Sequence, residues 1–214
     1  MEDRNFINGN LYHLYNRGVA KQRIFNNHYD YQRLLNTFAY YLDMSVTTKI
    51  SEVKKDKLAE ILSKKPKKPR IEIFSFCLMP NHFHLIVKQI LNFGITNFMR
   101  YSLDSYAKYF NVKYDRVGPI LQGKFKSKEI KTDEQFMHLS RYIDLNPLTS
   151  NLVSNPEEYD WSSFALYLSE TKTRLCQPKN ILGYFTSINE YNYFVKDFRD
   201  YIKSNEEISD LTFE

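Results

Sequence analysis

The order of hydrophobic and polar positions predicts β-strands in three parts of the chain. Residues 11–18 alternate between the two kinds and end at a glycine, which is typical of a strand followed by a turn. Two apolar runs within 71–89 are separated by Met79-Pro80-Asn81, which predicts a hairpin or a strand that turns tightly into its neighbour. Residues 120–130 predict a third strand region, with a bulge or bend at Gly123.

Helical spacing separates these strands. Apolar residues three and four positions apart, or a charged helical pattern, cover residues 30–44, 52–63, 95–110 and 190–202. A further helix should begin at Thr132 or Asp133, because either side chain suits an N-cap. It should end near Asn146, because Pro147 disfavours the helical conformation of the residue before it.

Strands interrupted by helices predict an α+β fold. The chain has 214 residues, of which 43% are hydrophobic, so one domain with a sizeable core and an appendage is expected. We place the domain at residues 1–165, with an insertion near 51–70, and a helical C-terminal extension at 166–214.

Composition adds a weak indication of a polyanionic partner. The formal net charge is +5, the pI is about 9.0 and aromatic residues make up 16% of the chain. A basic surface attracts polyanions, and aromatic rings can stack on unpaired bases. An aromatic core beneath a mildly basic surface explains the same numbers equally well. Lys64–Arg70 holds five positive charges and two prolines, so it is expected to be an exposed basic loop that either binds DNA or serves as a soluble linker.

Other function classes are disfavoured. No apolar stretch approaches the roughly 20 residues of a membrane-spanning helix, and the acidic N-terminal residues do not resemble a secretory signal. Cys77 and Cys176 form no metal-binding or disulfide spacing pattern. A cytoplasmic protein is therefore expected.

His82 and His84 form the sharpest chemical motif. Alternate side chains of a strand share a face, so these imidazoles should point the same way, about 7 Å apart along the backbone, while Phe83 points to the buried side. Two imidazoles can bind one divalent ion if a third ligand arrives from elsewhere. A pair of exposed strand histidines that binds nothing is the alternative.

Tyr142 and Asn146 form a second candidate pair. Residues four apart lie on one face of a helix, so both can face one site. A tyrosine hydroxyl can act as a covalent nucleophile, and an asparagine carbonyl can bind a hard metal ion. Because the chain has 17 tyrosines, Tyr142 could equally be one more core aromatic residue.

The motifs together resemble the single-tyrosine HUH transposases, of the REP-associated and small insertion-sequence type. Five blocks carry the resemblance, in this order: residues 12–18 (YHLYNRG), 76–85 (FCLMPNHFHL), 121–126 (LQGKFK), 138–147 (HLSRYIDLNP) and 159–163 (YDWSS). They cover nearly the whole chain. One departure is Asp144, which stands where members of the family commonly have histidine.

The resemblance implies a ferredoxin-like or RRM-like antiparallel sheet with helices on one face, and a catalytic domain at residues 1–165. It implies that His82, His84 and Asn146 bind Mg or Mn and that Tyr142 is the nucleophile. The implied substrate is single-stranded DNA, often with a hairpin, which is cleaved and rejoined through a 5′-phosphotyrosine. Relatives include monomers and homodimers, so the oligomeric state stays open.

Five polar residues are candidates for DNA binding: Arg17, Gln122, Lys124, Lys126 and Lys128. The three lysines alternate along one strand, where they can contact phosphates or only protect a sheet edge. Gln122 either contacts DNA or shapes the bend at Gly123. Two alternatives to a transposase are a non-catalytic (domesticated) single-strand-binding protein on this fold and a nuclease whose tyrosine is structural.

Overall fold

The computed structural model describes residues 5–171 and 173–197. Four strands form one antiparallel sheet in the order β2-β3-β1-β4: β1 (Leu11–Arg17), β2 (Ile71–Met79), β3 (His82–Gln89) and β4 (Lys126–Ile130). The helices are α1 (His28–Tyr41), α2 (Lys55–Ser63), α3 (Gly94–Lys113), α4 (Asp133–Thr149), α5 (Phe164–Leu168), α6 (Lys179–Leu182) and α7 (Ile188–Lys196). Short 3-10 helices lie at Val19–Lys21, Ile50–Glu52 and Pro156–Glu158.

The sheet confirms the α+β class and the antiparallel ferredoxin-like arrangement. Two central strands are β1 and β3, and the β2–β3 hairpin turns at Pro80-Asn81, as the sequence predicts. The chain passes through α1 between β1 and β2, and through α3 between β3 and β4. Each crossover returns the chain to the same sheet, so β1 can pair with both β3 and β4.

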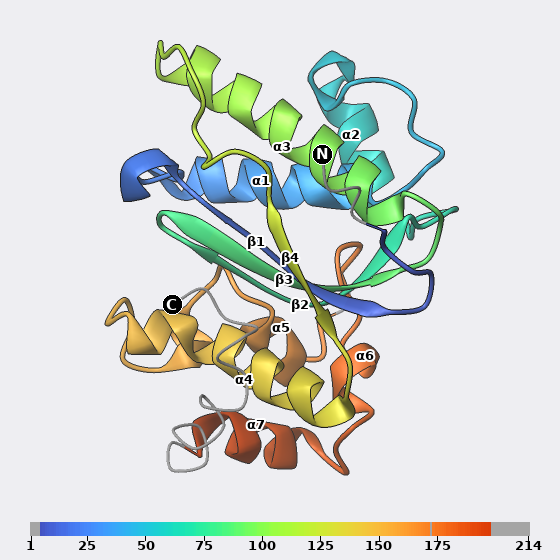
Figure 1. Cartoon of the computed structure of the whole chain (residues 1–214), viewed down its shortest axis with the longest axis vertical. Coiled ribbons are helices and arrows are strands. Elements are labelled where there is room, and N and C mark those ends of the chain that lie inside the picture. Colours follow the sequence, from blue (N-terminus) through green and yellow to red (C-terminus); the bar gives the residue numbers. More distant parts are fainter. Residues whose placement is uncertain (1–4, 172, 198–214) are drawn as a thin grey trace.

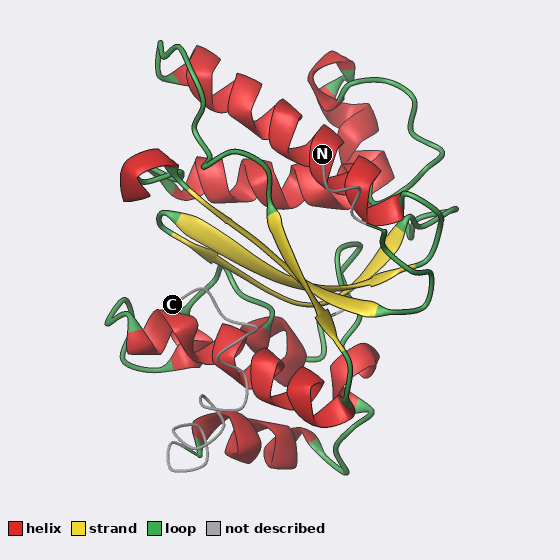
Figure 2. Ribbon diagram, in the orientation of Figure 1, coloured by secondary structure: helices red, strands yellow, loops and turns green. Residues whose placement is uncertain are grey.

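Helices cover both faces of the sheet rather than the one face that the resemblance implies, as Figures 1 and 2 show. One face carries α1 and α3, where Phe38 of α1 packs edge-on against Phe83 of β3. The other carries α4 and α5, with α7 packed beyond α4 (Figure 1). This second layer explains why Phe83 and His84, which point to opposite faces, are both fully buried.

Two predicted boundaries are wrong. Helix α4 does not end near Asn146 but continues through Pro147 to Thr149. Proline in the last turn removes only one intrahelical hydrogen bond, and the N–H groups of Ser150 and Leu152 bond to the carbonyls of Asn146 and Pro147. Strand β4 is also shorter than the predicted 120–130, because Gly123 adopts a left-handed φ of 65° that turns the chain before the ladder begins.

The C-terminal part packs on the sheet domain wherever it is described. Cys176 forms a parallel bridge with Ile73 of β2, and Arg174 forms an ion pair with Asp43 at 3.3 Å. The predicted helix over 190–202 corresponds to α7 up to Lys196, and its part from residue 198 lies outside the described residues.

Candidate active site

Strands β1 and β3 carry the candidate site on the sheet face beneath α4. Antiparallel pairing sets Arg17 opposite His82 and Tyr15 opposite His84. Directly paired residues share a face, so these four side chains lie together. The predicted orientation of the two histidines is therefore correct, and their ring centroids lie 5.0 Å apart.

His82 is held by the residue that precedes it. Its Nδ1 lies 2.6 Å from the side-chain oxygen of Asn81 in the hairpin turn. Because that oxygen accepts, Nδ1 carries the hydrogen and Nε2 keeps its lone pair. Burial, together with the positive charge of Arg17, lowers the pKa of His82 to about 4, so the imidazole is neutral at physiological pH.

His84 is held by a third histidine. The Nε2 atom of His13 in β1 lies 2.9 Å from Nδ1 of His84, and both side chains are fully buried. Burial holds the pKa of His84 well below its ordinary value, and His13, His82 and Arg17 add to the effect. A neutral imidazole is the form that binds metal ions.

Helix α4 brings the second pair to these histidines. The helix begins at the N-cap Thr132, whose hydroxyl accepts a hydrogen bond from the N–H of Gln135. Tyr142 then places its ring edge-on to His84, with centroids 5.6 Å apart, and the side chain of Asn146 is hydrogen-bonded to His82. The structure therefore brings together all four residues of the predicted catalytic and metal-binding set.

Asp144 points to a different environment. Its carboxylate accepts a hydrogen bond from the Tyr191 hydroxyl at 2.6 Å and a longer one of 3.5 Å from Ser163. Burial raises the pKa of Asp144 to about 7, although both hydrogen bonds oppose the rise. The departure from the family pattern therefore builds a buried contact between α4 and α7.

The donor set fits a divalent metal ion. Protein hydrogen bonds at Nδ1 orient both imidazoles, as is usual for histidine ligands. Two imidazole nitrogens and an amide oxygen leave coordination positions for substrate oxygens and water. Among residues 5–171 and 173–197, no three His, Cys, Asp or Glu side chains form a metal-binding group.

Two of the predicted DNA-binding residues, Lys126 and Lys128, lie on the edge strand β4, and Arg17 lies on the neighbouring strand β1. Lys126 pairs with Tyr15 and Lys128 with His13, so the lysines of edge strand β4 share the face of the histidines. Lys124 and Gln122 are exposed in the segment before β4, where the N–H of Gln122 donates to the carbonyl of Arg17.

The basic loop Lys64–Arg70 is anchored by its backbone. The N–H groups of Lys67 and Lys68 donate to the Asp43 carboxylate, and the carbonyl of Lys68 accepts from the N–H of Met44. Burial opposes ionisation of Asp43, but these and other hydrogen bonds lower its pKa to about 2. The loop is therefore fixed to the end of α1.

One residue of the site, His13, was not among the predicted site residues. His13 belongs to the first recognised block, yet its contact with His84 depends on which strands pair. An antiparallel register that sets Tyr15 opposite His84 places His13 diagonally beside it. The signal was the alternation of His13, Tyr15 and Arg17 along β1, but the sequence alone did not fix the pairing.

Comparisons with known proteins place this geometry in context. A family model described as "Transposase IS200 like" matches residues 46–146. A solved structure described as a REP-associated tyrosine transposase bound to a REP hairpin has a similar fold, with a TM-score of 0.52 and 17% identity, and the alignment covers 79% of this chain and 85% of that chain. No curated protein matches this sequence. Within the described residues, no helix is long and apolar enough to cross a membrane. The family match and the shared fold confirm the resemblance of this chain to the single-tyrosine HUH transposases.

Proposed function

We propose that this chain is a DNA transposase that cleaves and rejoins single-stranded DNA through a 5′-phosphotyrosine at Tyr142, assisted by Mg or Mn. The observation that supports this best is the gathering of four side chains from distant segments. His82 and His84 come from β3, whereas Tyr142 and Asn146 come from α4. A merely structural tyrosine would not need oriented, neutral imidazoles beside it.

His82, His84 and Asn146 would hold the metal ion. When bound, the ion supplies Lewis-acid stabilisation of the negative charge on the scissile phosphate. The chain's own contribution is to orient the ligands: Asn81 fixes the ring of His82, and His13 fixes the ring of His84. Arg17, which lies opposite His82 in the β1–β3 register, adds a positive charge near the position proposed for the scissile phosphate.

In the proposed cleavage step, one phosphate ester bond forms as another breaks. The Tyr142 hydroxyl oxygen forms a bond to phosphorus as the bond to the 3′ oxygen of the neighbouring nucleotide breaks. The phenol loses its proton, and the leaving 3′ oxygen gains one. Because a phosphodiester is replaced by another phosphodiester, a second 3′-hydroxyl can reverse the step and rejoin the strand without ATP. This favours strand transfer over simple hydrolysis.

The substrate strand would run along the lysine edge of the sheet. Arg17, Lys126 and Lys128 share the candidate face, and Lys124 and Gln122 extend the line beyond β4. The similar solved structure is bound to a REP hairpin, so a single strand beside a hairpin is the substrate that we propose. We further propose residues 1–165 as the catalytic domain and 166–214 as an extension whose α7 supports the tyrosine helix through Asp144.

Denaturing electrophoresis tests the proposal. Protein is mixed with labelled single-stranded DNA, with and without hairpins, in Mg or Mn. We expect a covalent protein–DNA band that Tyr142→Phe abolishes. Tyr109→Phe is the control and should leave the band intact, because the Tyr109 hydroxyl is hydrogen-bonded to Asp30 outside the site. Cleavage that survives Tyr142→Phe would indicate a nuclease with a structural tyrosine. Binding without cleavage under all conditions would indicate a non-catalytic single-strand-binding protein.

A further inference from the structure

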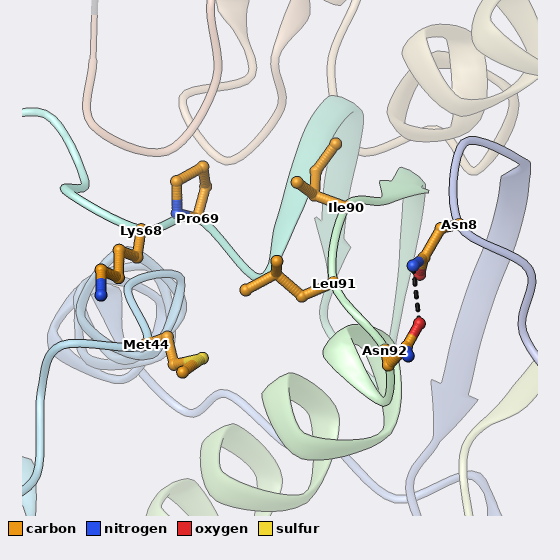
Figure 3. Close-up of a pocket in the computed structure, with 7 residues that line it drawn as sticks. All are labelled: Asn8, Met44, Lys68, Pro69, Ile90, Leu91 and Asn92. Carbon is orange, nitrogen blue, oxygen red and sulfur yellow. Dashed lines mark hydrogen bonds between the residues drawn. The ribbon is translucent and has the colours of Figure 1, made fainter.

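A pocket of about 620 Å³ lies at the other end of β3 from His82, between the basic loop and the segment that leads into α3. Its apolar wall consists of Met44, Pro69, Ile90 and Leu91 (Figure 3). The volume falls in the range of about 300–1,000 Å³ that is usual for small-ligand sites. Its mouth is open, so a group that remains attached to a polymer can enter.

Two amides form the polar side of this pocket. The Nδ2 group of Asn8 donates to Oδ1 of Asn92 at 2.6 Å, and Figure 3 shows the pair across Leu91 from Met44. Within residues 5–171 and 173–197, neither Oδ1 of Asn8 nor Nδ2 of Asn92 has a protein hydrogen-bond partner. The pair therefore keeps one acceptor and one donor for a ligand, and the edge of a nucleobase presents both kinds of group.

The segments that supply the pocket's lining also carry basic and aromatic side chains. Exposed Lys65, Lys67 and Lys68 belong to the anchored loop, and Lys68 itself lines the pocket. The guanidinium of Arg100 lies 4.7 Å from the ring centroid of the partly exposed Tyr101. The side chain of Phe93, next to Asn92, is 71% exposed. Cations with exposed aromatic rings are the usual equipment of a surface that binds single strands.

The pocket is separate from the candidate active site. His82 begins β3, and Ile90 follows its last residue, Gln89. Seven steps of about 3.3 Å along the strand place the two ends roughly 23 Å apart. At about 3.4 Å of strand per nucleotide, roughly seven nucleotides span that distance, and fewer do if the strand is extended.

We propose that this pocket binds one unpaired nucleotide of a single-stranded DNA, with its base between Met44 and the Asn8–Asn92 pair and its phosphates against the basic loop. This proposal rests on the proposed function in one respect, the choice of single-stranded DNA as the ligand. In this proposal the basic loop binds DNA instead of serving as a linker. Its hydrogen bonds to Asp43 hold it as one wall of the pocket, where it contacts the same DNA strand that enters the candidate active site.

The test measures affinity without catalysis. The full chain is titrated, in EDTA, with a fluorescent single strand of about 16 nucleotides, the upper end of common site sizes, and with the matching duplex. Asn8→Ala/Asn92→Ala and, separately, Met44→Glu should weaken single-strand binding about fivefold or more, which corresponds to about 1 kcal/mol, the net contribution of a single hydrogen bond. Duplex affinity should not change with the amide variant. The control is Gln32→Ala/Asn36→Ala, which removes a similar exposed amide pair from α1.

Photo-crosslinking locates the contact directly. A 4-thiothymidine moved along the oligonucleotide should crosslink to residues 90–93 or Met44 at one position of the scan. Equal single-strand affinities in the variants and the control, or equal losses for strand and duplex, would overturn the proposal. Failure to form a covalent adduct with metal would contradict the proposed function and leave this binding test unaffected.

Discussion

Replacement of His13 tests the candidate site without altering the proposed nucleophile or any proposed metal ligand. His13→Phe keeps a buried aromatic ring at this position of β1 but removes the nitrogen that lies 2.9 Å from Nδ1 of His84. Both side chains are fully buried, so water cannot readily replace the lost hydrogen bond. The ring of His84 then loses the contact that fixes its orientation.

The size of the effect follows from this geometry. Loss of a buried hydrogen-bond partner costs about 1–3 kcal/mol in the free energy of unfolding. Removal of a side chain that orients a metal-binding histidine usually lowers metal affinity about 10–100-fold. We therefore expect His13→Phe to fold with reduced stability and to need about 10–100 times more Mn for half-maximal formation of the covalent adduct.

The assay is a titration of Mn against adduct yield at fixed DNA, with urea denaturation to measure stability. His28→Phe is the matched control, because His28 is exposed at the start of α1. His13→Gln, which retains a hydrogen-bonding group, should recover part of the metal affinity. A folded His13→Phe protein with the wild-type Mn requirement would refute the orienting role of His13.

Three further predictions concern DNA, pH and the C-terminal helix. Lys128→Ala should reduce the slope of log affinity against log salt by about 0.7 for single strands, whereas Lys108→Ala on α3 should not, as salt titrations of binding would show. The folded pKa of Asp43 lies at about 2, below the ordinary 3.8, so its stabilising effect is present above pH 3.8 and is lost as pH falls through 2. The urea midpoint should therefore fall less steeply between these pH values in Asp43→Asn than in the wild type. Tyr191→Phe removes the hydrogen bond to buried Asp144 and should cost about 1–3 kcal/mol of stability, with faster hydrogen exchange in α4 and α7; unchanged exchange there would contradict the contact.

Much of the fold could be predicted because the local signals agree with the final structure. Alternation located β1 and the β2–β3 hairpin, and spacing located α1 and α3, within a few residues. The predicted end of α4 was wrong because a proline in the last turn of a helix costs only one intrahelical hydrogen bond, so it does not have to end the helix. The second layer of helices was missed because periodicity does not say which face of a sheet a helix covers.

The four residues of the candidate site could be identified because motif and resemblance pointed to the same positions. Their surroundings could not, since His13 reaches His84 only through strand pairing and Asp144 reaches Tyr191 only through packing of α7 on α4. The pocket at the end of β3 likewise unites segments far apart in sequence, such as those of Asn8, Met44 and Asn92. No local pattern marks such a site.

The most direct test of the central claim is to map the covalent adduct by mass spectrometry. Wild-type protein is incubated with single-stranded DNA and Mn, the DNA is trimmed with a nuclease, and the protein is digested to peptides. We predict a nucleotide linked through its 5′-phosphate to the peptide that contains Tyr142, together with a DNA product that ends in a free 3′-hydroxyl. An adduct on another residue, or cleavage that leaves Tyr142 unmodified throughout the reaction, would contradict the account.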